Sequence, residues 1–357
     1  MEIDGTDRAI ILTADDAISA KQATVDAGYY SDPFLSAFAS SAVGFSGSSQ
    51  NPIIRKKYHQ PLIKRGTHAR VSCIDRGIRA FLELKHTETP QVVILGAGLD
   101  TTFFRCFSGM LSNMTLNGIR WYEVDHPTVI KSKATTILHL TQTSMPHTRI
   151  EQASSLGYLV SMEGSNFTCF MVGHDLRQVG ILDGLHAFEK NAPTLFVLEC
   201  VAMYLPAARS KSLFETIGQQ CSKSCVLLYD PILGDSPFGR VMEDHLSRAE
   251  VLTPQSSMVQ TRTISIHLKK LIGCGFRVAV GCDMWDAYQS VVSSEQRQQA
   301  NKCEILDEIE EWMMIMRQYC LVVACNNDSL AHYCQVGKSS LLGFSDGLCE
   351  ILTLEVC

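Results

Sequence analysis

The stretch QVVILGAGLDTTFFR, residues 91–105, decides the fold of this chain. Its run Val92–Leu95 is entirely apolar, which is typical of a strand buried on both faces in a parallel sheet. Gly96 and Gly98 follow directly, and glycine lets the backbone turn sharply and approach a ligand closely. Open α/β sheets bind ligands at the carboxyl ends of their strands, so the stretch predicts a ligand-binding α/β domain.

Apolar runs alternate with helix-length segments after this stretch. The alternation predicts βαβ crossovers and a mainly parallel sheet with helices on both faces. We expect seven strands, at residues 92–95, 119–124, 167–172, 194–198, 226–229, 276–280 and 321–324. A strongly amphipathic helix is expected over residues 304–317. These patterns divide the chain into an N-terminal helical cover (1–90), a Rossmann-like domain (91–326) and an extension (327–357) of unpredicted structure.

Composition narrows the class of protein. The chain has 357 residues, of which 46% are hydrophobic and 19% charged, as in a globular protein with a large core. Its net charge of −6 argues against a general nucleic-acid binder. No apolar run reaches the roughly 18 residues that span a bilayer, and the N-terminus has acids where a secretory signal has lysines. We therefore expect a cytoplasmic protein that binds neither nucleic acid nor membrane.

The positions of the fourteen cysteines are consistent with the reducing environment of the cytoplasm. Several lie in or beside apolar runs, where cysteine behaves as a small hydrophobic residue. No CxxC pair occurs, which argues against a structural zinc site. We expect reduced thiols and no bound metal.

Acids follow four of the predicted strands: Asp125, Asp175, Glu199 and Asp230. Each acid alone is equally typical of a helix cap. Because the ends of parallel strands meet at one edge of a sheet, the four acids and the glycine turn together predict a polar binding site. Asp125 is placed to accept hydrogen bonds from both hydroxyls of a ribose.

The remaining acids indicate which cofactor the site would hold. Asp175 would accept a hydrogen bond from an adenine amino group, and Leu176 would pack on the ring. Glu199 would face the centre of the cofactor, where a carboxylate favours a cationic group. A dinucleotide turn has a third glycine where this chain has Thr101, and Asp100 would repel a pyrophosphate. The residues therefore favour S-adenosylmethionine, with its positive sulfonium, over a nicotinamide dinucleotide.

Several segments in order resemble the leucine carboxyl methyltransferases. The segments are AKQATVDAGYYSDPF (20–34), RGTHARVSCIDRGIRAFL (65–82), LGAGLDTTFFR (95–105), YEVDHP (122–127), GHDL (173–176), LECVAMYLP (198–206) and CDMWDAY (282–288). The resemblance covers most of residues 20–325. Thr67 and His68 depart from it, because the family usually has a bulkier aromatic residue before the arginine.

The resemblance implies the fold and the site residues. The fold would be α/β, of the class I S-adenosylmethionine-dependent methyltransferase type, with a seven-stranded, mostly parallel sheet, helices on both faces and an N-terminal helical cover. Lys21 and Arg70 would hold the methionine carboxylate of the cofactor, and Tyr204 would lie in the reaction pocket. The implied cofactor contacts are Lys21, Arg70, Gly96, Asp125, Asp175, Leu176 and Glu199, and the implied catalytic residues are Arg70 and Tyr204.

The resemblance also implies the reaction, which is methylation of the C-terminal leucine carboxylate of the protein phosphatase 2A catalytic subunit. An α-carboxyl group has a pKa of about 3.5, so the acceptor is already an anion at neutral pH. Catalysis then requires orientation and removal of water rather than a general base. Arg70 suits this role, because a guanidinium grips a carboxylate with two parallel hydrogen bonds and lysine cannot.

The sequence bears on three alternatives. The carboxyl methyltransferases of transfer-RNA wybutosine synthesis carry a β-propeller extension, which the residues after 327 are too few to form. A small-molecule O-methyltransferase would need a general base, for which His126 or His174 could serve. A non-catalytic binding protein would not need the acids at the strand ends. We expect a monomer whose basic run, residues 55–65, could attract an acidic surface of the protein substrate.

Overall fold

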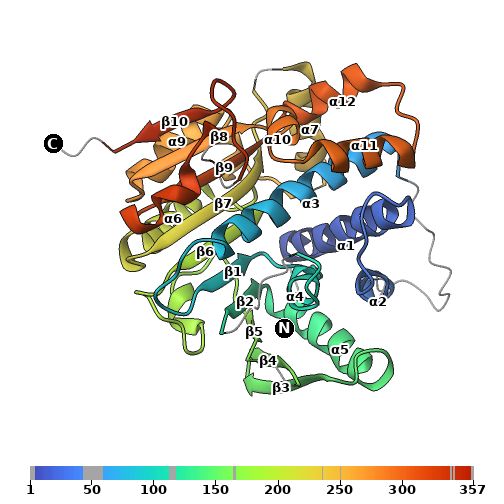
Figure 1. Ribbon diagram of the computed structural model, residues 1–357, viewed down its shortest axis with the longest axis vertical. Helices are drawn as coiled ribbons and strands as arrows, with labels where there is room; N and C mark the ends of the chain where they lie inside the picture. The colour runs from blue at the N-terminus through green and yellow to red at the C-terminus, as the bar shows by residue number, and fades with distance from the viewer. Residues whose placement is uncertain are drawn as a thin grey trace.

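The computed structural model describes residues 5–42, 59–111, 118–163, 166–234, 236–249, 251–337, 340 and 342–354. Figure 1 shows a single large sheet with helices packed on both of its faces. The strands are β1 (Gln91–Leu95), β2 (Arg120–Asp125), β3 (Thr148–Ser154), β4 (Gly157–Met162), β5 (Thr168–Gly173), β6 (Thr194–Glu199), β7 (Ser224–Pro231), β8 (Val278–Asp283), β9 (Tyr319–Cys325) and β10 (Glu350–Thr353). The α/β class predicted from the sequence is confirmed.

The helices fall between the strands and before the first of them. They are α1 (Gly5–Asp26), α2 (Leu35–Ala42), α3 (Pro61–Leu82), α4 (Thr102–Phe107), α5 (Pro127–Thr143), α6 (Ala207–Gln220), α7 (Pro237–Arg248), α8 (Ser257–Gln260), α9 (Ile264–Gly273), α10 (Met284–Ser290), α11 (Ser294–Cys303) and α12 (Ile309–Met316). Two 3-10 helices are η1 (Ile181–Gly184) and η2 (Asp328–Cys334). Among the described residues, no helix combines the length and the apolar character needed to cross a membrane.

The sheet has a parallel centre and antiparallel flanks. Its order is β10-β8-β9-β7-β6-β1-β2-β5-β4-β3. The central strands β7, β6, β1, β2 and β5 pair in parallel. β9 runs antiparallel to both β7 and β8, and the β3–β4 hairpin adds antiparallel strands beyond β5. The carboxyl ends of the parallel strands therefore gather at one edge, as the sequence predicts.

The expected seven-stranded sheet is wrong in number, because the described residues form ten strands in a mixed sheet. All seven expected strands are present, and β3, β4 and β10 are additional. Most residues of β3 and β10 are exposed, so neither strand has an apolar run that marks it in the sequence. β10 pairs with β8 and adds part of the C-terminal extension to the sheet.

Alternate residues of the strands enter two cores. Val92 and Ile94 of β1 pack in a core with α3, α4, α5 and α10. Val93 and Leu95 pack in a second core with α6, α9 and η1 on the other face. This burial on both faces is why β1 has only apolar residues between Gln91 and the glycine turn.

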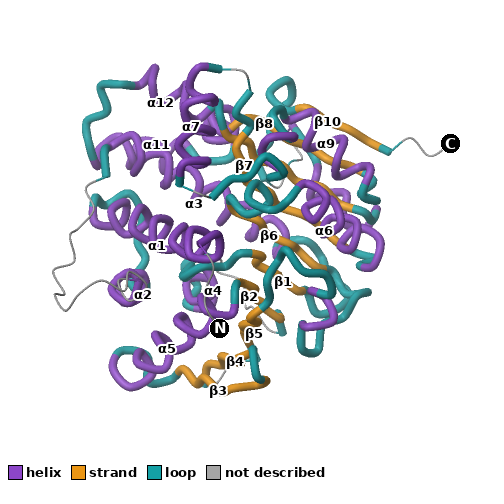
Figure 2. Tube along the Cα trace, turned by 180° about the vertical axis from the view of Figure 1, so that it is seen from behind, coloured by secondary structure: helices purple, strands orange, loops and turns teal. Residues whose placement is uncertain are grey.

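The helices before β1 lie together at the sheet. Figure 1 and Figure 2 show α1, α2 and α3 side by side, with α3 crossing close to the centre of the sheet. α3 begins with a proline in its first turn, where the missing N–H has no helical partner to lose. Its buried residues Ile74, Ile78 and Phe81 recur at helical spacing and face the first core. The helical pattern expected before residue 91 is therefore present in the described residues.

Two expectations about charged and amphipathic segments need correction. The helix expected over residues 304–317 begins only at Ile309, and the side chains of Ile305 and Ile309 are exposed. In the basic run, residues 55–58 lie outside the described residues, while Lys64 and Arg65 are buried in α3. Lys64 pairs with Glu304, and Arg65 donates a hydrogen bond to Asn301 at 2.6 Å, so these two cations do not form an exposed surface.

Candidate functional site

The turn after β1 is built by two glycines in the left-handed region. Gly96 has φ +73° and Gly98 has φ +52°, a region that other residues rarely adopt. A Cβ at Gly96 would lie 2.3 Å from Cγ2 of Val201, so a side chain cannot fit there. Asp125, at the end of β2, accepts hydrogen bonds from the N–H groups of Gly98 and His126, each at 2.6 Å. The acid predicted to bind a ribose therefore also fixes the shape of the turn.

The turn opens on a cavity of about 530 Å³, which we call the main cavity. All eight site residues predicted from the sequence line it: Lys21, Arg70, Gly96, Asp125, Asp175, Leu176, Glu199 and Tyr204. They come from α1, α3 and the ends or following turns of β1, β2, β5 and β6. The structure thus brings together residues that are as much as 183 positions apart (204 − 21), while the role of each residue stays a prediction.

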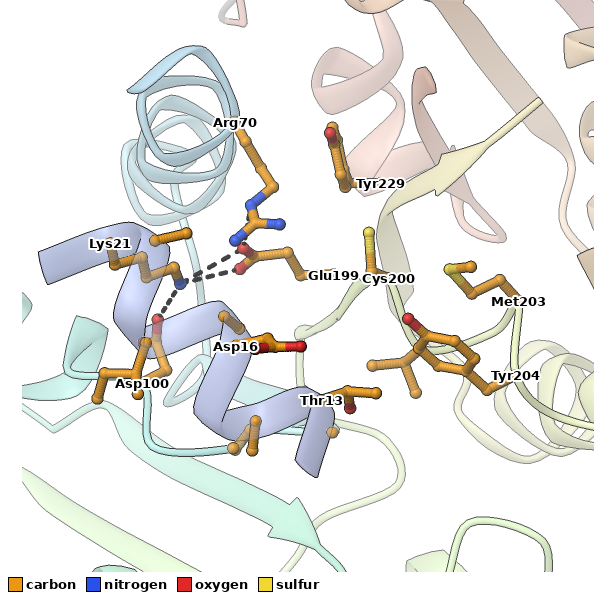
Figure 3. Close-up of a pocket in the computed structure, with 18 of the residues that line it drawn as sticks. Thr13, Asp16, Lys21, Arg70, Asp100, Glu199, Cys200, Met203, Tyr204 and Tyr229 are labelled. Atoms are coloured by element: carbon orange, nitrogen blue, oxygen red, sulfur yellow. Dashed lines mark hydrogen bonds and ion pairs between the residues drawn. The ribbon is translucent and has the colours of Figure 1, made fainter. Parts of the chain in front are cut away.

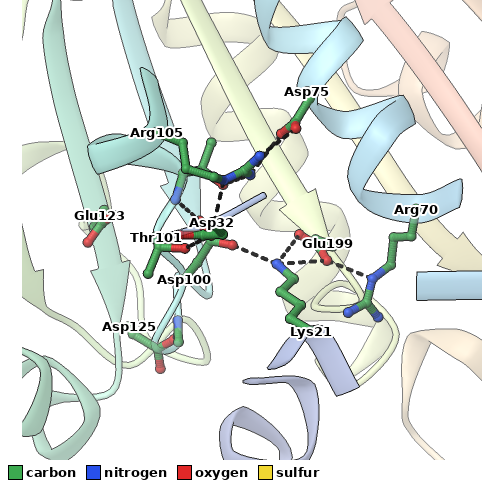
Figure 4. A network of polar contacts seen from close by, with 12 residues as sticks. Lys21, Asp32, Arg70, Asp75, Asp100, Thr101, Arg105, Glu123, Asp125 and Glu199 are labelled. Atoms are coloured by element: carbon green, nitrogen blue, oxygen red, sulfur yellow. Dashed lines mark hydrogen bonds and ion pairs between the residues drawn. The ribbon is translucent and has the colours of Figure 1, made fainter. Parts of the chain in front are cut away.

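One end of the main cavity, the charged end, is formed by Lys21, Arg70, Asp100, Asp125 and Glu199 (Figure 4). Lys21 Nζ lies 2.6 Å from Asp100 Oδ2 and 3.4 Å from Glu199 Oε1. Arg70 Nε lies 2.8 Å from the same oxygen of Glu199. Two cations from two helices of the cover therefore meet one carboxylate at the end of β6.

These contacts set the charges at this end. Burial works against the charge of Lys21, but Asp100 and Glu199 outweigh it and raise the pKa of the amine. Burial likewise favours neutral Asp100, yet Lys21, Arg105 and Lys133 hold its pKa below the usual value. Burial raises the pKa of Asp125, and its two backbone hydrogen bonds oppose that rise. Lys21 and Asp100 are therefore an ion pair at neutral pH.

A second group of ion pairs lies next to the charged end (Figure 4). Arg105 donates two hydrogen bonds to Asp75, at 2.5 and 2.9 Å, and lies 3.3 Å from Asp32. Asp32 accepts a hydrogen bond from Thr101 at 2.5 Å. This network joins α3, the segment after α1 and the start of α4, so it holds the cover against the glycine turn.

Asp175 and Leu176 lie in the turn after β5. The guanidinium of Arg177 donates to both carboxylate oxygens of Asp175, at 2.8 to 3.1 Å, and the Arg177 N–H donates at 2.9 Å. Burial raises the pKa of Asp175, but Arg177 outweighs it and the net shift is downward. Arg177 also lines the main cavity, so a ligand that bonds to Asp175 would share that carboxylate with this arginine.

The opposite end of the main cavity is apolar (Figure 3). We call it the apolar end, and its residues are Cys200, Met203, Tyr204, Met242, Leu246, Ile315, Met316 and Tyr319. The rings of Tyr229 and Tyr319 stack at 5.4 Å, and the guanidinium of Arg70 lies 5.8 Å from the Tyr229 ring centre. Arg70 therefore stands where the charged end meets the apolar end.

The segment after β6 carries strain and protonated side chains. Cys200 has φ +55°, which is unusual for a residue with a side chain and is found most often at functional sites. Burial raises the pKa of the Cys200 thiol to about 12 and also raises the pKa of Tyr204. Both groups are therefore neutral hydrogen-bond donors at pH 7, and neither is an anionic nucleophile.

Sequence reasoning missed several residues of the site. Asp16 of α1 points into the main cavity, and Tyr229 stands beside Arg70 (Figure 3). The sequence argument used Asp100 only against a pyrophosphate, although Asp100 lies just two residues after Gly98 of the glycine turn. Tyr229 lies one residue before Asp230 on β7, so the same strand-end argument could have found it.

Asp230 does not join the other strand-end acids. It is buried and is not among the residues that line the main cavity. Burial raises the pKa of Asp230 to about 7, and the N–H of Met203 donates a hydrogen bond to its carboxyl group. Asp230 therefore lies outside the main cavity and holds the segment that contains Met203 and Tyr204 through the hydrogen bond from Met203.

The two histidines considered as general bases differ in place. His126 lines the main cavity, and its Nδ1 accepts a hydrogen bond from the N–H of Thr128 at 3.3 Å, which caps α5. His174 is not among the lining residues. Within the described part of the chain, no cluster of three or more histidine, cysteine or acidic side chains is placed to hold a metal ion.

Comparison with known proteins finds similarity to one protein family. A family model described as leucine carboxyl methyltransferase matches residues 9–218. The chain is 27% identical to leucine carboxyl methyltransferase 1 of Yarrowia lipolytica over 333 residues, which cover 90% of this chain and 98% of that protein. It is 29% identical to the Cryptococcus neoformans protein of the same name, with 88% and 92% covered. A solved structure of geranyl diphosphate methyltransferase with GPP and sinefungin covers 71% of this chain and 78% of its own, at 9% identity and a TM-score of 0.40.

Proposed function

Since this chain belongs to the leucine carboxyl methyltransferase family, we propose that it methylates the C-terminal leucine carboxylate of the protein phosphatase 2A catalytic subunit, with S-adenosylmethionine as cofactor. The observation that carries the proposal is the meeting of Lys21 and Arg70 at Glu199, with Lys21 also bound to Asp100 just after the glycine turn. Two helices of the cover and the edge of the sheet thereby supply both signs of charge to one end of the cavity.

The charged end fits this cofactor. The left-handed turn at Gly96 brings the backbone to the wall of the main cavity, which suits close approach of a ligand to that backbone. Lys21 and Arg70 would donate hydrogen bonds to the methionine carboxylate while keeping contacts with Asp100 and Glu199. Asp125 would hold the ribose, and Asp175 with Leu176 would hold the adenine. Glu199 would stabilise the positive charge of the amino group or sulfonium.

When bound, S-adenosylmethionine supplies an activated methyl group. The acceptor carboxylate is ionised at neutral pH, so the chain has no proton to remove from it. Arg70 orients the carboxylate with its fork of N–H groups, and Tyr204 donates a hydrogen bond from its neutral phenol. The apolar end takes the leucine side chain and keeps water away from the carboxylate, which raises the reactivity of its oxygen.

Residues from the latter part of the chain would select the substrate. Met242 and Leu246 of α7 and Met316 of α12 line the apolar end and offer side chains that can adapt to leucine. The buried area of a leucine side chain is worth about 2 kcal/mol of binding. A substrate that lacks the terminal leucine would lose that contact together with the correctly placed carboxylate.

A labelling experiment tests the proposal. Purified protein is incubated with methyl-labelled S-adenosylmethionine and with the phosphatase catalytic subunit, either intact or lacking its last leucine. We expect label in the intact subunit only, in a form that mild base releases as methanol, as methyl esters do. Tight cofactor binding without label in either subunit would contradict the proposed substrate and would favour a small-molecule O-methyltransferase.

A further inference from the structure

Two cysteines face each other where the C-terminal extension joins the sheet. β10 pairs with β8 in antiparallel register, with Glu350 opposite Gly281 (Figure 1). One further step along this register places Cys349, the residue before β10, opposite Cys282 of β8. The two thiols are 67 positions apart in the chain (349 − 282), and the sheet brings them together.

The backbone spacing of this pair suits a disulfide. The N–H of Leu354 donates to the carbonyl of Arg277 at 2.7 Å, so these two residues form a hydrogen-bonded pair of the ladder. Hydrogen-bonded and non-hydrogen-bonded pairs alternate, so counting back along β10 makes Cys349 and Cys282 a non-hydrogen-bonded pair. The Cα atoms of such pairs are about 4.5 Å apart, and disulfides join Cα atoms about 4.4 to 6.8 Å apart. A bond between the two sulfurs therefore fits the existing strand pairing.

The two side chains lie on the same face of the sheet and touch. Cys282 is 1% exposed within the first core, and Cys349 packs against the same core. Ala279 and Leu352, at alternate positions of the two strands, pack in the second core instead. The Cys282 thiol donates a hydrogen bond to the sulfur of Cys349. Register, face and contact therefore agree.

The two thiols differ in exposure and in acidity. Cys349 is partly exposed, whereas Cys282 is buried. The hydrogen bond from Cys282 lowers the pKa of the Cys349 thiol, and the same contact together with burial raises the pKa of Cys282. Thiolates, rather than thiols, react with oxidants. Cys349 is therefore the sulfur that an oxidant in solution meets first, with Cys282 in place to complete a disulfide.

A second group of thiols, deeper in the sheet, offers a comparison. Cys225 of β7 lies opposite Cys325 of β9 in antiparallel register, and a hydrogen bond joins Cys325 to Cys334 of η2. None of these three residues is more than 5% exposed. Buried cysteines of this kind are inert toward reagents in solution. Of the two groups, only the one formed by Cys282 and Cys349 includes a thiol that solvent reaches.

We propose that Cys282 and Cys349 are a site of reversible oxidation, at which a peroxide closes a disulfide between β8 and the start of β10. The Cys349 thiolate attacks one oxygen of hydrogen peroxide, the O–O bond breaks, hydroxide leaves, and Cys349 becomes a sulfenic acid. The Cys282 sulfur then attacks the Cys349 sulfur. The S–O bond breaks as the S–S bond forms, and the Cys282 proton leaves with the hydroxyl group as water. Two electrons pass from the two thiols to the peroxide.

The disulfide would close a loop over residues 283–348, which contains α10, α11, α12 and β9. Ile315, Met316 and Tyr319 of the apolar end lie within this loop. A cross-link that closes a long loop stabilises the folded chain by restricting the unfolded one. Oxidation therefore fixes the C-terminal extension to the sheet and stabilises the segment that carries these three residues. Neither cysteine lines the main cavity, so the proposal does not depend on the proposed function.

The first experiment identifies the bond. The reduced protein is treated with a small excess of hydrogen peroxide, its free thiols are blocked with iodoacetamide, and it is digested without reduction for mass spectrometry. We expect one main pair of linked peptides, joined through Cys282 and Cys349 and separated by dithiothreitol. The absence of a disulfide, or equal amounts of one among Cys225, Cys325 and Cys334, would overturn the proposal.

The second experiment measures the effect of the bond on stability. After the same peroxide treatment, the melting temperature is expected to rise by about 4 °C and to return on addition of dithiothreitol. Cys349→Ser should show no rise, although its methionines meet the same peroxide. Cys303→Ser is the matched control, because Cys303 is also partly exposed, and it should keep the full rise. Equal shifts in Cys349→Ser and the unaltered protein, or no rise in protein that carries the linked peptides, would overturn the proposal.

Discussion

The charged end and the apolar end of the main cavity are built from different parts of the chain. The charged end comes from the ends of parallel strands and from α1 and α3, all within residues 9–218 that match the family model. Much of the apolar end comes from α7, β9 and α12, beyond that match. The charged end is thus built from the sheet edge and the first helices, and the apolar end draws many of its residues from elements that follow in the chain.

The two ends also differ in how their side chains are held. At the charged end, Lys21 has two ion-pair partners and Asp125 accepts two backbone hydrogen bonds. At the apolar end, Met242 is held by packing and by one long contact, 3.7 Å from the Tyr319 hydroxyl to its sulfur. We therefore expect changes at the charged end to have large, specific effects and changes at the apolar end to have graded ones.

Arg70→Lys should have the largest effect, because Arg70 stands where the two ends meet. Lysine keeps the positive charge beside Glu199 but lacks the fork that grips a carboxylate. We expect kcat/KM for the phosphatase subunit to fall about 100-fold, with the melting temperature nearly unchanged. Steady-state kinetics and thermal unfolding measure the two quantities.

Arg76→Lys is the control for this variant. Arg76 is on the same helix, and its guanidinium lies 3.1 Å from Glu83 on the protein surface, away from the main cavity. It should keep full activity. Turnover of Arg70→Lys at the rate of the unaltered protein would show that the guanidinium fork is not needed.

Asp125→Asn should have the next largest effect and should act on the cofactor alone. An amide cannot accept from both Gly98 and His126 through oxygens, so the glycine turn loses one of its two supports. We expect the Kd of S-adenosylmethionine to rise about 30-fold, or about 2 kcal/mol, as for loss of a charged hydrogen bond. Calorimetry measures this Kd, with Asp183→Asn, whose side chain is exposed on η1, as control. Equal affinities in the two variants would contradict this role of Asp125.

Met242→Ala should have a smaller effect, confined to the acceptor. Truncation removes part of the wall of the apolar end but none of the charged groups. We expect KM for the phosphatase subunit to rise about five-fold, or about 1 kcal/mol, with the Kd of S-adenosylmethionine unchanged. Val241→Ala, the exposed neighbour on α7, should change neither constant. A loss of cofactor affinity in Met242→Ala would show that the two ends are not separate.

This division explains what the sequence could predict. Asp125 and Glu199 each end a strand with an apolar run, so strand position alone brought them to one edge. Lys21 and Arg70 carry no such signal, and only the resemblance to a family placed them at the site. Met242 and Tyr319 reach the apolar end through the packing of helices and strands distant in sequence, which no local pattern encodes.

His68→Phe should leave activity unchanged. It tests whether the fold loses stability at acid pH because of His68 rather than because of the ion pairs at the charged end. His68 lies on α3 two residues before Arg70, but its ring packs against Tyr29 at 5.6 Å and Tyr288 at 6.1 Å, away from the ion pairs. Burial, with a smaller effect of Arg65, lowers the pKa of His68 from 6.5 to about 4. Phenylalanine keeps a ring in this packing and cannot titrate.

The direction of the pH effect follows from where the proton binds. Between pH 6.5 and about 4 the unfolded chain protonates His68 and the folded chain does not, so the stability that neutral His68 provides above pH 6.5 is lost as the pH falls. The loss is about 2 kcal/mol on going from pH 8 to pH 5. Because the pKa of Asp100 lies below its usual value, its pair with Lys21 persists over the same range. Urea unfolding at pH 8 and pH 5 should therefore show a smaller loss of stability for His68→Phe than for the unaltered protein, by about that amount. An equal loss in both proteins would place the acid sensitivity elsewhere, in groups such as buried His267, whose pKa is lowered to about 3 by burial.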